Sequence, residues 1–364
     1  MSLAGNRQQA PGRIGAPELS LGTDPRADQR MVAVLAQLGM AANAAPPAVP
    51  ANGARADQLA MLAGMESGFE QVYEALFAGL EPIEGLRSER VTIEGTGGNA
   101  IELTIDRPAA ATGPLPCVFH IHGGGMVIMS AAEPSYIRLR QEIAVRGAVA
   151  IGVEFRNGAG KLGAHPYPAG FEDCKAGVRW AISNLSALGG SGLVVAGDSG
   201  GGNLALAVAL AANREGWAGE IAGVHVQCPF IHGRTGTPPP ELTSLRANDG
   251  YFLSFDLLQV MAEAYDPGGS HAEEATCWPY HASEDDMAGL PPHVISVNEL
   301  DPVADEGIAY YRRLVRAGVA ARAQLNLGLC HTGDIMFPAA LPDVYAAAID
   351  AVVGFARSVV PAAP

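Results

Sequence analysis

The sequence is poor in charged residues, and above all in lysine. Of its 364 residues 17% are charged, and only Lys161 and Lys175 are lysines. The 23 basic residues against 38 acidic ones give a formal net charge of −15, and no basic cluster offsets it. Nucleic acid and anionic membranes bind to clustered positive charge, so neither is expected as a partner. A small neutral or weakly charged molecule is the better expectation.

Paired cysteines and long apolar runs are also missing. The five cysteines are odd in number, far apart and free of C-x-x-C or Cys/His spacing, which predicts reduced thiols, a cytoplasmic location and neither metal nor cofactor. The first 20 residues are polar and lack the apolar stretch of a signal peptide. No run reaches the ~18 apolar residues of a membrane span. We therefore expect no membrane contact.

What the sequence has in excess is glycine. The 45 glycines in 364 residues are about 12% of the chain, against a usual ~7%. They show no G-X-Y period, which excludes a collagen-like chain. Seven of them gather in two short runs, 123–125 and 197–202, and these runs follow apolar segments.

The first 84 residues read as two helices and a linker. Asp24 and Pro25 predict an N-cap and a first helical residue, and the linker over 41–56 is rich in alanine and proline. A second helix is predicted over 57–80 by apolar residues at three- and four-residue spacing. Two isolated helices cannot bury their apolar faces, so we expect them to lie across another part of the chain as part of a cap.

From residue 85 onward, short β-branched runs alternate with segments of helical length such as 171–188 and 203–213. This alternation predicts an α/β protein with a mostly parallel sheet and helices on both faces. We expect a hairpin of strands 91–93 and 101–105, and buried strands over 117–121, 148–155, 193–196, 224–228, 294–297 and 323–327. The interval between Pro229 and Pro292 is too long for a crossover. We assign 85–229 and 282–364 to the core, and 230–281 to a cap insertion.

The most informative segment is the motif Gly-x-Ser-x-Gly around Ser199. It follows an apolar strand and leads directly into an Ala/Leu-rich helix, which is the strand, turn and helix context of a nucleophile elbow. Gly197 and Gly201 permit the tight turn, and the start of the helix favours developing negative charge. Alone, the motif is ambiguous in a glycine-rich chain. In this context it makes Ser199 a candidate nucleophile.

A second glycine run follows another strand. His122 is followed by three glycines, and such a run exposes backbone N–H groups suited to an oxyanion. We predict an oxyanion hole formed by the N–H groups of Gly124, Gly125 and Gly200, with His122 supporting the loop. The alternative is a loop for a cofactor phosphate, but the glycine spacing fits neither common phosphate fingerprint.

A nucleophilic serine needs a base, and nine histidines compete for this role. His331 stands out because it follows the last predicted strand, at the sheet edge where α/β proteins assemble their sites. The acid should follow the preceding strand, where Asp301 is preferred, with Glu299 and Asp305 in reserve. The order Ser199, Asp301, His331 is that of α/β-hydrolases. This predicts acyl transfer through a Ser-His-Asp triad.

These motifs together resemble the hormone-sensitive-lipase family of bacterial esterases. The likeness rests on His122–Gly125, on Gly197–Leu204 and on Asp301–Gly307, and extends from about residue 18 to the C-terminus. The resemblance implies the α/β-hydrolase fold, a helical cap, the triad named above and carboxylesterase activity. Segments 165–168, 248–252 and 264–267 look closest to a member that opens a macrocyclic lactone. The implied substrate is a moderately large apolar ester or macrolactone.

Two features depart from the family. Gly200 replaces the usual alanine after the nucleophile, which should slightly loosen the elbow, and residues 156–160 are glycine-rich, which should reshape one pocket wall. Two other functions stay open: a catalytically silent ligand receptor of the same fold, and an amidase or peptidase. The presence of His331 speaks against the receptor. The family habit further suggests a homodimer formed through the strand at 323–327.

Overall fold

Eight strands form one sheet in the computed structural model of the protein, which describes residues 10, 12–233 and 238–360. The strand order is β1-β2-β4-β3-β5-β6-β7-β8. Only β2 runs antiparallel to its neighbours β1 and β4, and the pairs from β4 to β8 are all parallel. The strands are β1 Leu86–Glu94, β2 Ala100–Pro108, β3 Leu115–Ile121, β4 Val149–Glu154, β5 Gly190–Asp198, β6 Gly223–Gln227, β7 His293–Asn298 and β8 Ala321–Asn326.

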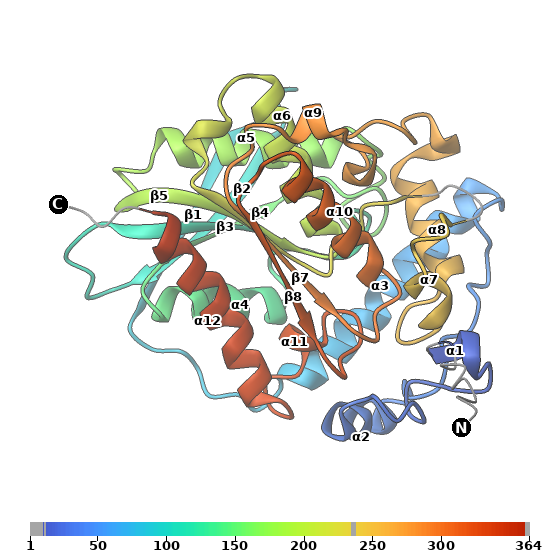
Figure 1. Ribbon diagram of the computed structural model, residues 1–364. Coiled ribbons are helices and arrows are strands. Elements are labelled where there is room, and N and C mark those ends of the chain that lie inside the picture. Colours follow the sequence, from blue (N-terminus) through green and yellow to red (C-terminus); the bar gives the residue numbers. More distant parts are fainter. Residues whose placement is uncertain (1–9, 11, 234–237, 361–364) are drawn as a thin grey trace, which may run out of the picture.

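Helices cover both faces of this sheet, as Figure 1 shows. On one face, α4 (Pro134–Val145) contacts β2 and β4, and α12 (Pro342–Val359) contacts β3 and β6. On the other face, α5 (Ala169–Ser183) and α6 (Gly200–Arg214) cover the middle strands, and α10 (Ala304–Arg316) covers β7 and β8. The predicted α/β-hydrolase fold with a mostly parallel sheet is confirmed.

The core lies where α6 crosses the sheet. Every residue of β4 except the last, and every residue of β6 and β7, is buried, as expected of parallel strands that are covered on both faces. Helix α6 is buried continuously from Gly200 to Ala212, because almost all of its side chains are Ala, Leu or Val. Burying each large aliphatic side chain stabilises the fold by about 1.5–3 kcal/mol. The residue between β5 and α6 is thus held in a rigid frame.

The N-terminal helices and the segment after β6 meet at one end of the molecule (Figure 1). Helix α3 (Arg55–Phe77) contacts α8 (Phe255–Tyr265), and the short α1 (Gly12–Gly15) contacts α7 (Ser244–Ala247). The remaining helical segments are α2 Gln29–Gln37, α9 Glu284–Met287, α11 Gly333–Met336 and the single turns Ala218–Glu220, Pro267–Gly269 and Pro279–His281.

The predicted start of α2 is wrong. Asp28 is its N-cap and accepts a hydrogen bond from the Arg30 N–H. Asp24 instead binds the Arg26 guanidinium and accepts a hydrogen bond from the Tyr251 hydroxyl, 2.9 Å away. The aspartate that has the sequence pattern of a helix cap therefore makes a tertiary contact, which links the N-terminal segment to the insertion. Across the described residues, we find no helix with both the length and the apolar character needed to cross a membrane.

Candidate active site

Ser199 occupies a sharp turn between β5 and α6. Its backbone has φ 52° and ψ −119°, a conformation that costs a non-glycine residue of order 1–3 kcal/mol. The turn is held because the Ser199 N–H donates to the Gln227 carbonyl at 2.8 Å. A Cβ on Gly197 would lie 2.3 Å from the Gly201 oxygen, and a Cβ on Gly201 would lie 2.0 Å from the Ile121 oxygen. Both glycines are needed for this packing, as the motif predicts.

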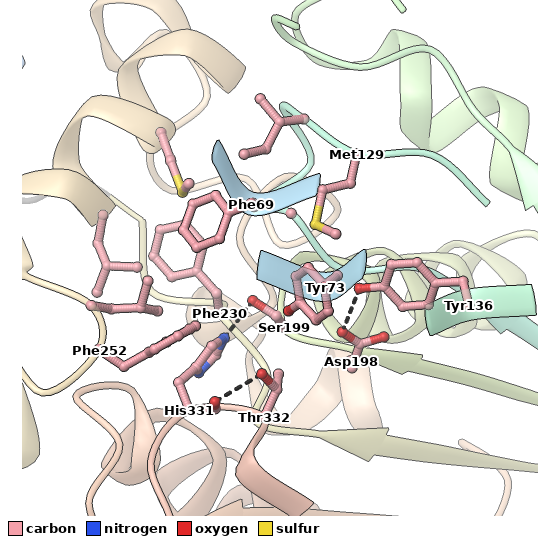
Figure 2. A pocket seen from close by; sticks show the side chains of 16 residues that line it. Phe69, Tyr73, Met129, Tyr136, Asp198, Ser199, Phe230, Phe252, His331 and Thr332 are labelled. Carbon is pink, nitrogen blue, oxygen red and sulfur yellow. Dashed lines mark hydrogen bonds between the residues drawn. The ribbon is translucent and has the colours of Figure 1, made fainter. Parts of the chain in front are cut away.

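The structure brings Ser199, His331 and Asp301 together, as Figure 2 shows for the first two. The His331 Nε2 lies 2.8 Å from the Ser199 Oγ, and its Nδ1 lies 2.7 Å from the Asp301 Oδ2. Asp301 follows β7, and His331 follows β8. The second oxygen of Asp301 accepts a hydrogen bond from the Val303 N–H at 2.9 Å. All three side chains are buried, so neither hydrogen bond competes with bulk water.

The electrostatic surroundings favour a proton on His331. Burial lowers the pKa of His331, but the charge and hydrogen bond of Asp301 outweigh it, and more distant carboxylates, Asp198 and Asp334, add to the effect. The net pKa lies above the ordinary value of 6.5. The ring can therefore receive a proton from Ser199 and hold it beside Asp301.

The two reserve carboxylates lie elsewhere. Glu299 accepts a hydrogen bond from the Gly328 N–H at 3.0 Å and faces the Arg26 guanidinium at 3.8 Å. Asp305 accepts from the Ser244 N–H at 2.7 Å, where it links α10 to the insertion. Sequence alone could not rank these residues firmly, because all three carboxylates lie within the seven positions that follow β7.

The predicted oxyanion loop lies directly over the elbow. Gly124 and Gly125 have φ 95° and 62°, and both line the same cavity as Ser199. The N–H of Gly200 belongs to the first turn of α6, where backbone donors have no partner within the helix. His122 donates from Nδ1 to the Gly123 carbonyl, 2.9 Å away, and burial lowers the pKa of His122 to about 3. These contacts place His122 beneath the loop and away from Ser199.

The two expectations drawn from family departures need revision. A Cβ on Gly200 would lie 2.5 Å from the Met126 nitrogen and 2.7 Å from the Gly125 Cα, so the loop fills the space that alanine would take. The elbow is closely packed at this point and is not loosened. The segment 156–160 is absent from the cavity wall; it lies behind the loop, where the Gly158 N–H donates to the Met126 carbonyl at 3.0 Å.

Beside Ser199 lies a cavity that is lined by sixteen residues. One side is apolar and includes Phe69 of α3 together with five side chains of the insertion. The other side is polar and carries Tyr73, Tyr136, Asp198 and Thr332 (Figure 2). The remaining lining residues are Gly124, Gly125, Ile128, Met129, Phe230, Phe252, Leu253, Leu258, Met261 and His331. Of the residues of α3, only Phe69 and Tyr73 line this cavity.

Sequence reasoning missed most of the polar side of the cavity. Asp198 stands within the quoted motif, yet nothing in the pattern gave it a role. In the structure it is buried, which raises the pKa of its carboxyl to about 7, and it accepts a hydrogen bond from the Tyr136 hydroxyl at 3.0 Å. Tyr136 and Thr332 carry no sequence signal at all, because only the fold brings α4 and the loop after β8 to this place.

One set of described residues has donor atoms spaced for a metal: Cys228, Asp301 and His331, within 4.8 Å of one another. The His331 Nδ1 and the Asp301 Oδ2 are already hydrogen bonded to each other. Burial raises the pKa of the Cys228 thiol well above its usual value, so the sulfur is held as a neutral thiol. This arrangement suits a packed triad better than a metal centre.

Comparison with known proteins agrees with this geometry. A family described by the alpha/beta hydrolase fold matches residues 118–333. The structure is similar to brefeldin A esterase, a bacterial homologue of human hormone-sensitive lipase, with TM-score 0.92 and 42% identity over 96% of this chain and 98% of that one. It is also similar to esterase Est22, with TM-score 0.83 and 33% identity over 93% and 99% of the chains.

A curated relative points the same way. Carboxylesterase NlhH of Mycobacterium tuberculosis is 29% identical over 269 residues, which is 72% of this chain and 80% of the relative. The predicted resemblance to the hormone-sensitive-lipase family is confirmed by these matches. The chain belongs to the α/β-hydrolase family, and within it is a carboxylesterase similar to brefeldin A esterase.

Proposed function

We propose that this carboxylesterase uses Ser199, His331 and Asp301 as a catalytic triad and forms an acyl-enzyme on Ser199. The observation that carries the proposal is the continuous pair of hydrogen bonds, 2.8 and 2.7 Å long, that joins the three side chains at the cavity. The Ser199 Oγ gives its proton to the His331 Nε2 as it attacks the ester carbonyl carbon. The imidazolium that forms lies against the Asp301 carboxylate.

The glycine N–H groups complete the first step. As the C–O bond to Ser199 forms, the carbonyl oxygen becomes an oxyanion, and in this proposal the N–H groups of Gly124, Gly125 and Gly200 donate to it. The intermediate collapses when His331 returns its proton to the leaving alkoxide and the ester C–O bond breaks. Water, deprotonated by the same ring, then attacks the acyl-enzyme and frees the acid and Ser199.

The cavity supports a moderately large apolar ester or a macrolactone as substrate. Its apolar side comes from α3 and the insertion, in line with a cap made of residues 1–84 and 230–281. Apolar side chains favour uncharged groups, because an unpaired charge is costly to bury. The likeness to an esterase named for brefeldin A favours the inclusion of macrolactones among the candidates.

A substrate panel tests this proposal. At equal concentration, we expect hydrolysis of neutral p-nitrophenyl esters with acyl chains of two to eight carbons, and at least ~10-fold lower kcat/KM for a matched ester whose acyl chain ends in a carboxylate. The panel also includes a macrolactone and the p-nitroanilide matched to the best ester. Release of p-nitrophenol measures the chromogenic esters, and chromatography measures lactone opening.

The same panel separates the alternatives. An amidase would hydrolyse the anilide at a readily measured rate, whereas an esterase would leave it intact, and a silent receptor would bind the esters without turnover. Hydrolysis of the anilide, or binding without turnover, would contradict the proposal. A strong preference for the carboxylate-bearing ester would leave the triad in place but would refute the apolar substrate class.

The pH dependence gives a second test. His331 must be neutral to take the Ser199 proton, so kcat/KM should rise with pH through the pKa of His331 in the free enzyme. Because the net pKa of His331 is raised, we expect the midpoint of this acid limb above pH 6.5. Initial rates with one neutral ester across a buffer series of constant ionic strength measure it. A midpoint below 6.5 would mean that Asp301 does not support the imidazolium.

We also infer a homodimer and a reducing compartment. Strand β8 is the last strand of the sheet, and Leu325 and Leu327 at its end are 50% and 70% exposed, which supports pairing with a second copy of the chain. The five cysteines are free and buried, as expected of thiols kept reduced in the cytoplasm.

A further inference from the structure

One buried side chain, Tyr136 of α4, joins the two loops that carry the proposed oxyanion donors. Strands β3 and β5 pair in parallel only as far as Ile121 and Gly197. Beyond these residues one chain turns into the oxyanion loop and the other into the elbow, so the ladder no longer fixes the distance between them. The spacing of the donors must then depend on side chains and on packing between the loops.

The Tyr136 hydroxyl makes a hydrogen bond to each loop. It donates to the Asp198 Oδ2 at 3.0 Å and accepts from the Gly123 N–H at 2.9 Å. Asp198 immediately precedes Ser199, and Gly123 immediately precedes Gly124. The bridge therefore ends one residue away from the nucleophile on one side and one residue away from a proposed donor on the other.

The residues around this bridge are closely packed. A Cβ on Gly123 would lie 2.4 Å from the Asp198 Oδ2 and 2.8 Å from the Tyr136 Oη, and a Cβ on Gly200 would strike the backbone of the oxyanion loop. Tyr136 and Asp198 are 5% and 2% exposed. Both hydrogen bonds of the bridge lie among buried groups, where a hydrogen bond is stronger than in bulk water.

We propose that Tyr136 is a positioning residue, which bridges Asp198 and Gly123 and so holds the oxyanion loop at the depth where its N–H groups meet the tetrahedral intermediate. The inference rests on the proposed triad and oxyanion hole and adds a residue to neither. Stabilisation of an oxyanion depends on donors placed 2.7–3.1 Å from its final position, so a small retreat of the loop weakens the transition state more than the bound substrate.

The test is Tyr136→Phe, which removes the hydroxyl and keeps the ring that packs against His122 at a centroid distance of 5.5 Å. We expect kcat to fall about 10- to 100-fold while KM changes by less than about threefold. Affinity for a trifluoromethyl ketone, which forms a tetrahedral adduct with the serine, should fall by the same factor as kcat/KM. The matched control is Tyr310→Phe, another buried tyrosine whose hydroxyl has no hydrogen-bond partner within the part of the chain described. It should keep its activity.

A double-mutant cycle makes the role of the bridge specific. Asp198→Asn keeps an oxygen that can accept from Tyr136 but removes the charge, so Tyr136→Phe should cost less in this background than in the native one. Asp198→Asn also serves as the second variant if Tyr136→Phe does not fold. Its loss of activity should likewise appear in kcat and in ketone affinity, with little change in KM.

Several outcomes would overturn the inference. They are a kcat for Tyr136→Phe within about twofold of the native value, a loss confined to KM, unchanged ketone affinity, or fully additive effects in the cycle. The proposed function is judged separately. If the native protein hydrolyses the ester and the Ser199→Ala variant does not, that function stands whatever Tyr136→Phe does.

Discussion

Ser199→Ala is expected to lower kcat for the best neutral ester by about 10⁵- to 10⁶-fold, down to the residual rate that binding and the oxyanion donors sustain. The variant loses only the Oγ that forms the acyl bond and the hydrogen bond to the His331 Nε2. The Ser199 N–H to Gln227 bond does not involve the side chain, so the turn should persist. Burst and steady-state release of p-nitrophenol measure the effect.

The matched control for this variant is Ser296→Ala. Ser296 is a buried serine of β7 whose Oγ accepts a hydrogen bond from the Asn326 amide at 3.0 Å, away from the cavity. Its loss should reduce stability by about 1 kcal/mol and leave kcat within about twofold. Circular dichroism and thermal unfolding show whether each variant is folded. Turnover by folded, carefully purified Ser199→Ala above a few per cent of the native rate would contradict Ser199 as the nucleophile.

The strands of the sheet and the chain order of Ser199, Asp301 and His331 could be predicted because both depend on local sequence patterns. Buried parallel strands are continuous apolar runs, and a Cβ added to the glycines around Ser199 would meet backbone atoms at distances as short as 2.0 Å, so glycine is required at these positions. His331 could be selected because it follows the last parallel strand. Each of these signals lies within a few residues of the atom whose position it predicts.

What the sequence could not predict comes from contacts between distant segments. Asp24 has the spacing of a helix cap, but the Tyr251 hydroxyl, 227 positions away, decides where its carboxylate lies. Tyr136 reaches Asp198 because the fold brings α4, which packs against β2 and β4, close to the end of β5. The sequence alone predicts a loosened elbow at Gly200, because it does not show that a Cβ at this position would lie 2.5 Å from the Met126 nitrogen in the loop after β3. A local sequence pattern does not show how two distant loops pack against each other.

Asp301→Asn should be the next most damaging single change, with kcat lower by about 10⁴-fold. The Val303 N–H donates to the Oδ1 of residue 301, so the amide oxygen of asparagine should face Val303 and its NH₂ group should face His331. An NH₂ donor forces the His331 Nδ1 to accept, which puts the ring proton on Nε2. That tautomer cannot take the Ser199 proton.

The contrasting variant is Glu299→Gln, which replaces the carboxylate two residues upstream. Glutamine still accepts a hydrogen bond from the Gly328 N–H, and the ion pair with Arg26 is partly exposed and long at 3.8 Å, so we expect kcat within about threefold of the native value.

The pH profile of the two variants gives an independent test of which carboxylate is the acid. Without the Asp301 charge the pKa of His331 should fall. The residual activity of Asp301→Asn should therefore persist to lower pH than native activity, whereas Glu299→Gln should not shift the acid limb of the pH profile. A larger loss of kcat in Glu299→Gln than in Asp301→Asn would mean that Glu299 is the acid. This would require a rearrangement of the loop after β7, because the Glu299 carboxylate faces Gly328 and Arg26.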